Sequence, residues 1–265
     1  MMGLVDGFAW RWQLMRRRLY LATSFRNGVA LALAHRSRVP LGRAVRWDGT
    51  VIIHPPDLGG LPETLLEVWR DQVYTRGFYV PQPGHRVIDG GANIGLFSLW
   101  IARQAPCRIV AFEPVRRNYE MLLENLDNAG VTTVEAKQAG LSGIPGHATM
   151  TSSPRSLDHR LVPVRGAAAP EAVPTYSLAQ AVAFAGGEVD LCKLDIEGSE
   201  RDVFEAVDDE TLRKVRRFAI EYHDNIRPGT RDVLCRRLED THNVRVEPAP
   251  AGYGMLYSRR RDVSS

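Results

Sequence analysis

One glycine-rich turn constrains the fold of this chain more than any other feature. It reads GGANIG at residues 90–95, after an apolar run at 86–89 and before residues 96–104, whose apolar side chains recur at helical spacing. Glycine lets the backbone turn sharply and leaves room for a ligand beside the start of the helix. The segment therefore predicts a strand, a ligand-binding turn and a helix.

The alternation of strand and helix continues along the chain. Further buried strands are expected at 108–114, 131–136, 189–196, 218–222, 245–248 and 255–258, and helices at 116–129, 200–207 and 231–240. Alternation of this kind predicts an α/β fold whose open sheet of seven mostly parallel strands carries helices on both faces.

Residues 1–60 are predicted to be an N-terminal helical segment followed by a β-hairpin that turns at Asp48-Gly49. Residues 1–46 contain nine arginines and a single acid, Asp6, and the first helix mixes these arginines with Trp10 and Trp12. Two arrangements fit such a helix. It can pack its aromatic side on the main domain, or it can make peripheral contact with an anionic membrane.

The main domain is expected over residues 61–265, beginning with a helix near 62–74. Residues 152–174 interrupt it with four prolines and no apolar periodicity, which predicts an insertion loop or lid. The acceptor pocket is expected to be built from this loop, the N-terminal helix and the segment after His223.

Composition excludes several classes of protein. The three cysteines, 107, 192 and 235, are too far apart for a disulfide framework or a metal knuckle, so a cytoplasmic location is expected. The apolar run at 28–34 is far below the roughly 20 residues of a membrane span, and no signal peptide is readable. Arginine outnumbers lysine 31 to 3, a bias that we attribute to genome composition and not to nucleic-acid binding.

Two acids frame the glycine-rich turn: Asp89 precedes it, and Glu113 ends the next strand. The turn lacks the second glycine of a dinucleotide-binding GxGxxG, and a carboxylate at position 89 would repel a pyrophosphate. It suits a cationic ligand such as S-adenosylmethionine, with Glu113 accepting the ribose hydroxyls. The structural alternatives are a turn cap for Asp89 and a helix-start acid for Glu113.

Polar residues also end the fourth and fifth strands. Period-two alternation places Lys193, Asp195 and Glu197 on one side of the fourth strand and Cys192 on the other, and it pairs Glu221 with His223 on the fifth. Because ligands bind beyond the carboxyl ends of such strands, these groups are expected to converge with Asp89 and Glu113.

Four sequence blocks, in this order, resemble the FkbM family of S-adenosylmethionine-dependent methyltransferases. The similar region covers about residues 63–223, and the blocks are VIDGGANIGLFSLWIA, AFEP with Asn118 and Asn125 behind it, KLDIEGSE and AIEYH. The lead-in YTRGFYVPQPG at 74–84 is also similar. The resemblance implies a class I, Rossmann-like methyltransferase fold and O-methylation of a hydroxyl on a natural product, sugar or glycan.

Carried over residue by residue, the resemblance assigns a cofactor site and leaves one segment open. The cofactor-binding residues that we expect from the motifs and the resemblance together are Asp89, Gly90, Gly91, Ala92, Asn93, Gly95, Glu113, Ser142 and Asp195. Residues 176–180, YSLAQ, lack the Leu-Asp pair found in many relatives, so no acceptor role is transferred to them.

A hydroxyl acceptor needs a base, and the predicted catalytic residues are His223, Lys193, Glu221 and Asp195. His223 is the first candidate because a free imidazole is largely neutral at pH 7, whereas Lys193 among acids is expected to stay charged. The alternatives are an ion pair between Lys193 and Glu221, a structural histidine at 223, and a divalent cation held by Asp195, Glu221 or Asp224 with His223.

Two other functions compete with methyl transfer. One is a non-catalytic S-adenosylmethionine-binding scaffold that docks a membrane or a partner, and the other is a nucleotide-dependent oxidoreductase. The sequence does not fix the acceptor or the oligomeric state.

Overall fold

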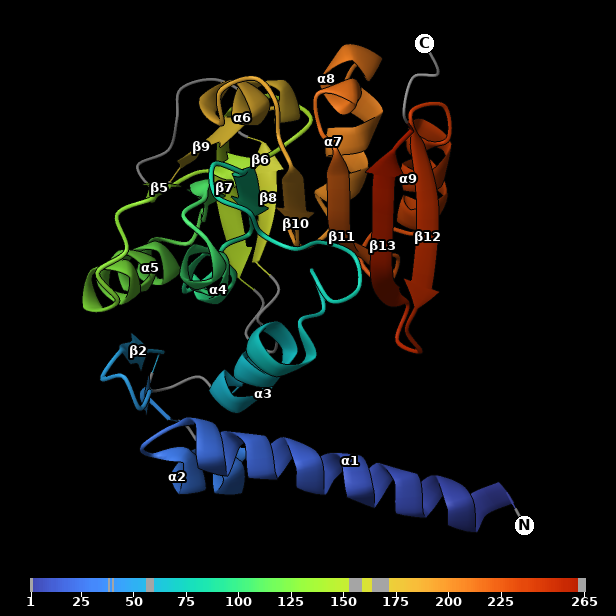
Figure 1. The fold of residues 1–265 in the computed structure, drawn as a ribbon. Coiled ribbons are helices and arrows are strands. Elements are labelled where there is room, and N and C mark those ends of the chain that lie inside the picture. Colours follow the sequence, from blue (N-terminus) through green and yellow to red (C-terminus); the bar gives the residue numbers. More distant parts are fainter. Residues whose placement is uncertain are drawn as a thin grey trace.

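A seven-stranded sheet forms the centre of the computed structural model, which describes residues 2–37, 39, 41–55, 60–152, 159–163 and 172–261 (Figure 1). In spatial order its strands are β12 (His242–Pro248), β13 (Tyr253–Arg260), β11 (Arg217–His223), β10 (Leu191–Leu194), β3 (Arg86–Gly90), β4 (Arg108–Phe112) and β5 (Val134–Lys137). The strands from β11 to β5 are parallel, and β13 is antiparallel to both of its neighbours. The predicted α/β sheet is confirmed.

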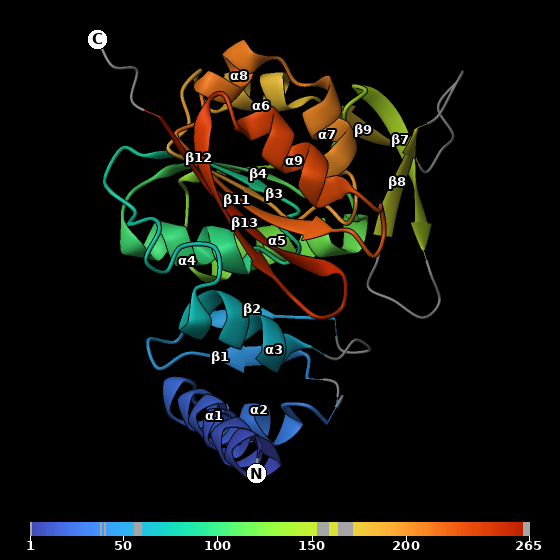
Figure 2. The same cartoon turned by 90° about the vertical axis from the view of Figure 1, so that its right-hand side faces the viewer.

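Helices cover both faces of this sheet because its central strands are apolar on both sides. Within β3, Val87 packs in the cluster that includes the helices α4 (Leu96–Gln104) and α5 (Arg116–Asn128). Its neighbour Ile88 packs in the opposite cluster. The helices of that second layer are α6 (Leu178–Phe184), α7 (Glu200–Ala206), α8 (Asp209–Arg213) and α9 (Thr230–Leu238). Figure 2 shows the two layers above and below the sheet.

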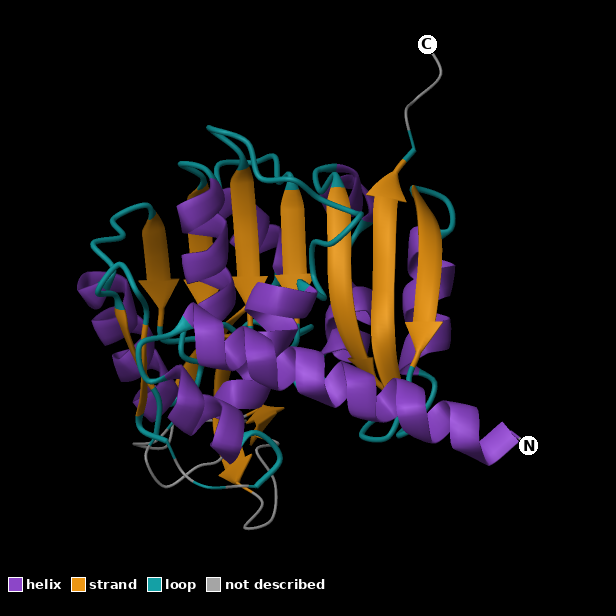
Figure 3. Ribbon diagram, turned by 60° about the horizontal axis from the view of Figure 1, so that its bottom comes forward, coloured by secondary structure: helices purple, strands orange, loops and turns teal. Residues whose placement is uncertain are grey.

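The N-terminal segment contains the predicted helix and hairpin. Its elements are α1 (Met2–Ser24), α2 (Gly28–Ala34), β1 (Arg43–Val45) and β2 (Val51–Ile53), and the helix expected near 62–74 at the start of the main domain is found as α3 (Leu61–Leu65) and the π-helix η1 (Leu66–Asp71). Leu21 and Phe25 at the end of α1 are fully buried, whereas Trp10 and Trp12 are about half exposed. The aromatic residues near α1 are therefore divided: Tyr20 and Phe25 pack with the core, whereas Trp10 and Trp12 do not, and Figure 3 shows the N-terminal end projecting beyond the strands.

A second sheet contains part of the predicted insertion loop. Its four strands, in spatial order, are β6 (Gly140–Leu141), β9 (Val173–Tyr176), β7 (Gly146–Ser152) and β8 (His159–Pro163). The expectation of a loop over 152–174 was wrong for these strands, because they are too short for a clear alternation and Pro163 lies at the end of an edge strand, where proline is tolerated. The remainder, 153–158 and 164–171, lies outside the described residues.

No helix in the described part of the chain combines the length and hydropathy needed to cross a membrane.

Candidate active site

The strand order places a ligand site between β3 and β10. The chain moves outward from β3 to β4 and β5 on one side and from β10 to β11 on the other, so β3 and β10 form the switch point of the sheet. Loops diverge from the carboxyl ends of two such strands and leave a crevice. Asp89 pairs with Lys193 in register across these strands, so the two motifs found in the sequence meet there.

The turn after β3 depends on glycine at defined positions. Gly91 has φ +71°, and a Cβ there would lie 1.7 Å from the carbonyl oxygen of Asp195. Gly95 has φ +87°, and its Cβ would lie 2.5 Å from Leu122 Cδ1. Asn93 also has a positive φ, +50°, a conformation that asparagine tolerates better than most residues. The turn therefore brings bare backbone to the edge of the crevice.

Glu113 follows β4 and is 4% exposed. Its Oε2 accepts a hydrogen bond from the backbone N–H of Asn93 at 2.8 Å, and its Oε1 accepts one from the N–H of Val115 at 2.8 Å. Burial raises the pKa of Glu113 to about 7, against these hydrogen bonds, which lower it. The carboxylate is thus held at the crevice in a fixed orientation.

A cofactor hollow of about 600 Å³ of empty space opens at this point. Its polar lining comes from the glycine-rich turn and from Glu113, Asn118, Asp195 and Glu197. Its apolar lining comes from Phe112, Leu141, Met150, Leu161 and Ile196. A carboxylate beside an apolar slot is the arrangement that a nucleoside requires, with its ribose hydroxyls at the acid and its base in the slot.

Gly91, Asn93, Glu113 and Asp195 line this hollow, whereas the other five predicted cofactor residues, Asp89, Gly90, Ala92, Gly95 and Ser142, do not. Asp89 is fully buried, accepts a hydrogen bond from Ser98 Oγ at 2.7 Å, and pairs with Lys193 Nζ at 3.2 Å. The expected direct contact of its carboxylate with a cationic ligand is therefore wrong for this arrangement. Ser142 is buried next to Leu141, and its hydroxyl accepts from the N–H of Ile144.

Lys193 is an internal cation that shapes the turn. Its Nζ donates hydrogen bonds to the carbonyl oxygens of Gly90 at 3.1 Å and Gly91 at 2.6 Å, in addition to its ion pair with Asp89. Burial lowers the pKa of Lys193, but the charges of Asp89 and Asp195 outweigh it and raise the pKa. The lysine stays charged, as expected, and its ion pair is with Asp89 instead of Glu221.

A second, larger hollow, the acceptor hollow, adjoins the first. Gly91, Asn93, Asn118, Asp195 and Glu197 line both hollows. The acceptor hollow is otherwise lined by the end of β2, by α3 and η1, and by the polar side chains His54, Thr64, Glu67, Tyr74, Lys193, Glu221 and His223. The predicted contributions of α1, the 152–174 segment and the residues after His223 are not found among the described residues.

Acidic groups crowd the inner wall of the acceptor hollow. The hydroxyl of Tyr74 lies 3.1 Å from Asp195 Oδ2 and 3.2 Å from Glu221 Oε2. Burial, followed by the charge of Asp195, raises the pKa of Glu67 to about 7 and that of Glu221 to about 8. Burial raises the pKa of Tyr74 well above its usual value. Glu221 and Asp195 therefore come together as predicted.

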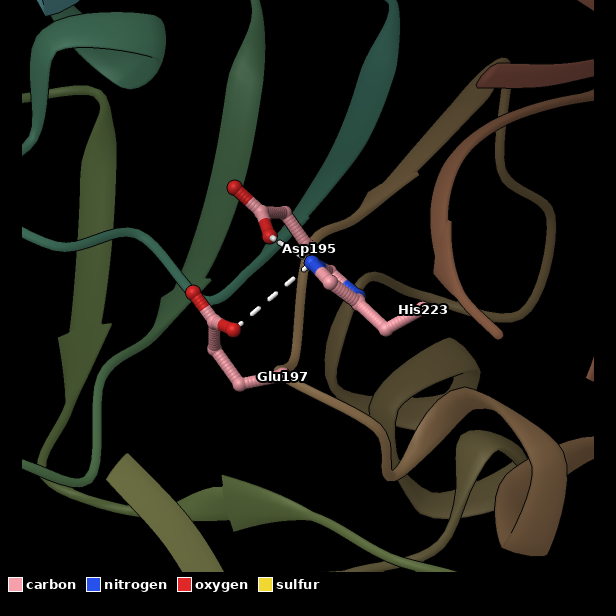
Figure 4. Close-up of side chains that lie close together, drawn as sticks. All are labelled: Asp195, Glu197 and His223. Carbon is pink, nitrogen blue, oxygen red and sulfur yellow. Dashed lines mark ion pairs between the residues drawn. The ribbon is translucent and has the colours of Figure 1, made fainter. Parts of the chain in front are cut away.

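His223 is more basic than the sequence analysis assumed. Its Nδ1 lies 3.0 Å from Oε1 of the fully buried Glu200, and its Nε2 faces Glu197 and Asp195 at 3.6 and 3.9 Å (Figure 4). Burial lowers the pKa of His223, but Glu200 and the two other acids outweigh it and raise the pKa to about 9. The expectation that His223 is largely neutral at pH 7 was therefore wrong.

Sequence reasoning missed several residues of the site. Glu67 gave no signal because it lies within a helical segment whose pattern explains an exposed acid, whereas Glu200 and Tyr74 were noted only as members of the KLDIEGSE and lead-in blocks. Asp224, one of three acids named as alternative ligands of a divalent cation, accepts a hydrogen bond from the N–H of Arg231 at the start of α9. Cys192 is fully buried in the apolar cluster away from the crevice, as predicted.

The fold and its two adjoining hollows define a class I methyltransferase. A profile described as the methyltransferase FkbM domain matches residues 89–253. The chain therefore belongs to the FkbM methyltransferase family, as its four sequence blocks predicted, and family membership supports methylation that depends on S-adenosylmethionine.

The chain is also similar to individual proteins. Methyltransferase sdnD of Sordaria araneosa is 31% identical over 219 residues, which cover 66% of this chain and 82% of that protein. The AMB antimetabolite synthetase AmbE of Pseudomonas aeruginosa is 32% identical over 196 residues, which cover 60% of this chain but only 9% of the synthetase. Among solved structures, a putative rRNA methylase of Clostridium thermocellum covers 69% of this chain and 90% of its own, with 8% identity and a TM-score of 0.47.

Proposed function

We propose that this chain transfers a methyl group from S-adenosylmethionine to a hydroxyl of a small-molecule natural product or a saccharide. The observation that carries the proposal is the pair of adjoining hollows that share Asp195 and Glu197, one suited to a nucleoside and the other lined by acids. The family match favours this function over a nucleotide-dependent oxidoreductase.

The cofactor hollow fits S-adenosylmethionine by its chemistry. The Cβ missing at Gly91 leaves main chain bare, Glu113 offers carboxylate oxygens to the ribose, and Leu141, Met150 and Leu161 form an apolar wall for the adenine. When bound, this cofactor supplies an electrophilic methyl group on a sulfonium. Much of what the chain then contributes is alignment of the acceptor in a site shielded from water.

The acceptor hollow supplies a place for the proton that the hydroxyl must lose. In the transfer the acceptor oxygen gains the methyl carbon, the carbon–sulfur bond breaks, and the hydroxyl proton passes to a carboxylate. Glu221 lines the hollow and is linked through Tyr74 to Asp195, so we assign Glu221 as the proton acceptor, active in its ionised form, which predominates above its pKa of about 8. Lys193 and His223 are already protonated, so we assign them roles in balancing the charge of nearby acids and in positioning groups of the site.

The acceptor class is inferred from the hollow and from one relative. Side chains of the acceptor hollow are largely hydrogen-bonding groups, which suits a hydroxylated molecule better than a purely apolar one. One matching segment belongs to an antimetabolite synthetase, which supports a natural-product acceptor.

Calorimetry followed by a product assay tests the proposal. We expect the folded protein to bind S-adenosylmethionine at micromolar concentrations and to give a product 14 mass units heavier with a member of a hydroxylated acceptor panel, 14 being the net gain of a CH₂. Absence of cofactor binding at millimolar concentration would overturn the proposal. Binding without turnover of any acceptor would favour the scaffold function instead.

We also propose that α1 contacts an anionic membrane surface. Trp12, Met15 and Leu19 recur at helical spacing and are each about half exposed, and exposed arginines at 11, 16 and 18 flank this stripe. The opposite side of α1 faces the protein, where Arg17 pairs with Asp71. An apolar stripe bordered by arginines is complementary to anionic headgroups over acyl chains.

A further inference from the structure

A cluster of three side chains lies where the two hollows meet. Oxygen atoms of Asp195 and Glu197 and a ring nitrogen of His223 all lie within 4.8 Å of one another (Figure 4). We propose that these three residues bind a divalent cation, Mg²⁺ or Mn²⁺, and that the cation holds the oxygen of the methyl acceptor. The role in catalysis rests on the proposed function, whereas the binding of the cation does not.

The imidazole is the feature that separates this cluster from an ordinary acidic patch. The side chain of His223 is 8% exposed, and its Nε2 points between the two carboxylates at 3.6 and 3.9 Å, which is beyond hydrogen-bond distance. Ligands about 2.1 Å from an octahedral ion lie about 3 Å apart when adjacent and about 4.2 Å apart when opposite. The cluster therefore needs only small side-chain movements to close on an ion.

Surrounding groups orient the ligands as they do in metal sites. The buried Glu200 holds Nδ1 of His223 at 3.0 Å, which directs Nε2 into the cluster. Such a carboxylate behind a metal-bound histidine is a recurring arrangement. Tyr74 contacts Oδ2 of Asp195, which leaves Oδ1 on the side of His223. Glu221 contacts the same hydroxyl and lies outside the three-ligand set, so it remains available for the proton.

The donor set selects the kind of ion. Two carboxylates and one imidazole, with no sulfur, favour a hard divalent cation such as Mg²⁺ or Mn²⁺. The cation takes the place of the proton on Nε2, because only a neutral imidazole nitrogen can ligate a metal. Three protein ligands fill half of an octahedron and leave three positions toward the hollows.

The location of the cluster restricts the acceptor. Asp195 and Glu197 line both hollows, and His223 lines the acceptor hollow, so the open coordination positions face the place where the acceptor must lie. An acceptor with two adjacent oxygen atoms, such as a vicinal diol or an α-hydroxy acid, can occupy two of these positions and present one oxygen for methylation. We infer that the substrate carries such a pair of oxygens.

Titration of the full chain with Mn²⁺, followed by electron paramagnetic resonance, tests the site. We expect one tight Mn²⁺ per chain, at least tenfold weaker binding in Glu197→Gln, and a nitrogen coupling to the bound ion that is lost in His223→Gln. The control Glu205→Gln removes an exposed acid on α7 that pairs with Arg201, and it should bind Mn²⁺ like the wild type.

The outcomes separate this inference from the proposed function. No stoichiometric Mn²⁺ at millimolar concentration, or equal binding by the wild type and both site variants, would overturn the cation site while leaving cofactor binding intact. Circular dichroism of the same samples shows whether the variants are folded. Loss of cofactor binding in the wild type with Mn²⁺ binding retained would overturn the methyl-transfer proposal and leave the cation site standing.

Discussion

Lys193 and Asp89 form a buried ion pair across the two strands at the switch point of the sheet, with Nζ 3.2 Å from Oδ1. Lys193 also donates to the carbonyls of Gly90 and Gly91, so one ammonium group fixes both the acid before the turn and the backbone of the turn. The sequence pattern predicted that a cationic ligand would lie beside the carboxylate of Asp89. In the structure the ammonium group of Lys193 takes that place.

Removing the lysine should leave the carboxylate of Asp89 buried without its counter-charge. We expect Lys193→Met to lower the free energy of unfolding by about 3–5 kcal/mol, as measured by urea denaturation. Lys214→Met is the control, because Lys214 forms an exposed pair with Glu210 and its loss should change the free energy of unfolding far less. Equal stability of the two variants would show that the pair between Lys193 and Asp89 is not a structural tie.

Replacing Gly91 by alanine should disrupt the turn. The added Cβ would meet the carbonyl oxygen of Asp195 at 1.7 Å, so strand β10 or the turn must move, and cofactor binding should be lost in calorimetry. Gly130→Ala is the matched control, because Gly130 also has a positive φ but would place its Cβ in open space. It should cost only about 1 kcal/mol in stability, and weakening of cofactor binding to the same degree would contradict the steric argument.

Replacing Glu113 by an uncharged residue should weaken binding of the cofactor. In Glu113→Gln the side chain loses its charge and one acceptor, so we expect S-adenosylmethionine to bind about 10- to 100-fold more weakly, since hydrogen bonds to charged groups contribute about 1.5–3 kcal/mol. Glu120→Gln, on the exposed face of α5, is the control. An unchanged dissociation constant for Glu113→Gln would remove this acid from the ribose site.

Glu67 should make stability depend on pH. Its folded-state pKa of about 7 lies above its ordinary value of 4.5, so the stability that it contributes is complete below pH 4.5 and is lost as pH rises through 7. We expect Glu67→Gln to exceed the wild type by on the order of 1–3 kcal/mol at pH 8.5 and to match it near pH 4.5. The measurement is chemical denaturation at both values.

The exposed Glu124 supplies the control for this pH series. Glu124→Gln should differ from the wild type by the same small amount at every pH. If the stability difference between Glu67→Gln and the wild type does not grow from pH 4.5 to pH 8.5, burial does not destabilise the ionised form of Glu67.

The stripe on α1 should govern partitioning onto vesicles. We expect the full chain to sediment with vesicles rich in phosphatidylserine, to stay in solution with neutral phosphatidylcholine vesicles, and to lose most of its binding in a Trp12→Ala, Leu19→Ser double variant. Val80→Ser changes an exposed apolar residue distant from α1 in sequence and is the control. Equal sedimentation of the double variant and the wild type would contradict the proposal that the stripe on α1 contacts the membrane.

Most of the sheet could be predicted because its strands are buried on both faces and are separated by recognisable helices. The runs around Val87, Ile109 and Leu191 are mostly apolar, and every expected strand of the main sheet is found within a few residues. The second sheet was missed because its strands are short and rich in polar residues and proline, so no periodic pattern distinguishes them from a loop.

The sequence could predict which residues come together at the site. It could not predict their protonation states or their ion pairs. Topology alone brings Glu113, Asp195, Glu221 and His223 to one edge of the sheet. The protonation of His223 depends on Glu200, which reaches it from the start of α7, and no local pattern at residue 200 reveals that contact. Pairing of Lys193 with Asp89 likewise depends on the register of two strands that are about 100 residues apart in the chain.

The outer wall of the cofactor hollow belongs to the second sheet, through Met150 on β7 and Leu161 on β8. Leu161 also lies so close to Gly140 that a Cβ there would be 2.4 Å from its Cδ1, so this hairpin is seated tightly against the crevice. A sheet separate from the central one therefore forms part of the wall of the cofactor hollow. Substitutions in its strands can alter the exchange of spent cofactor for fresh without touching the groups assigned to the reaction.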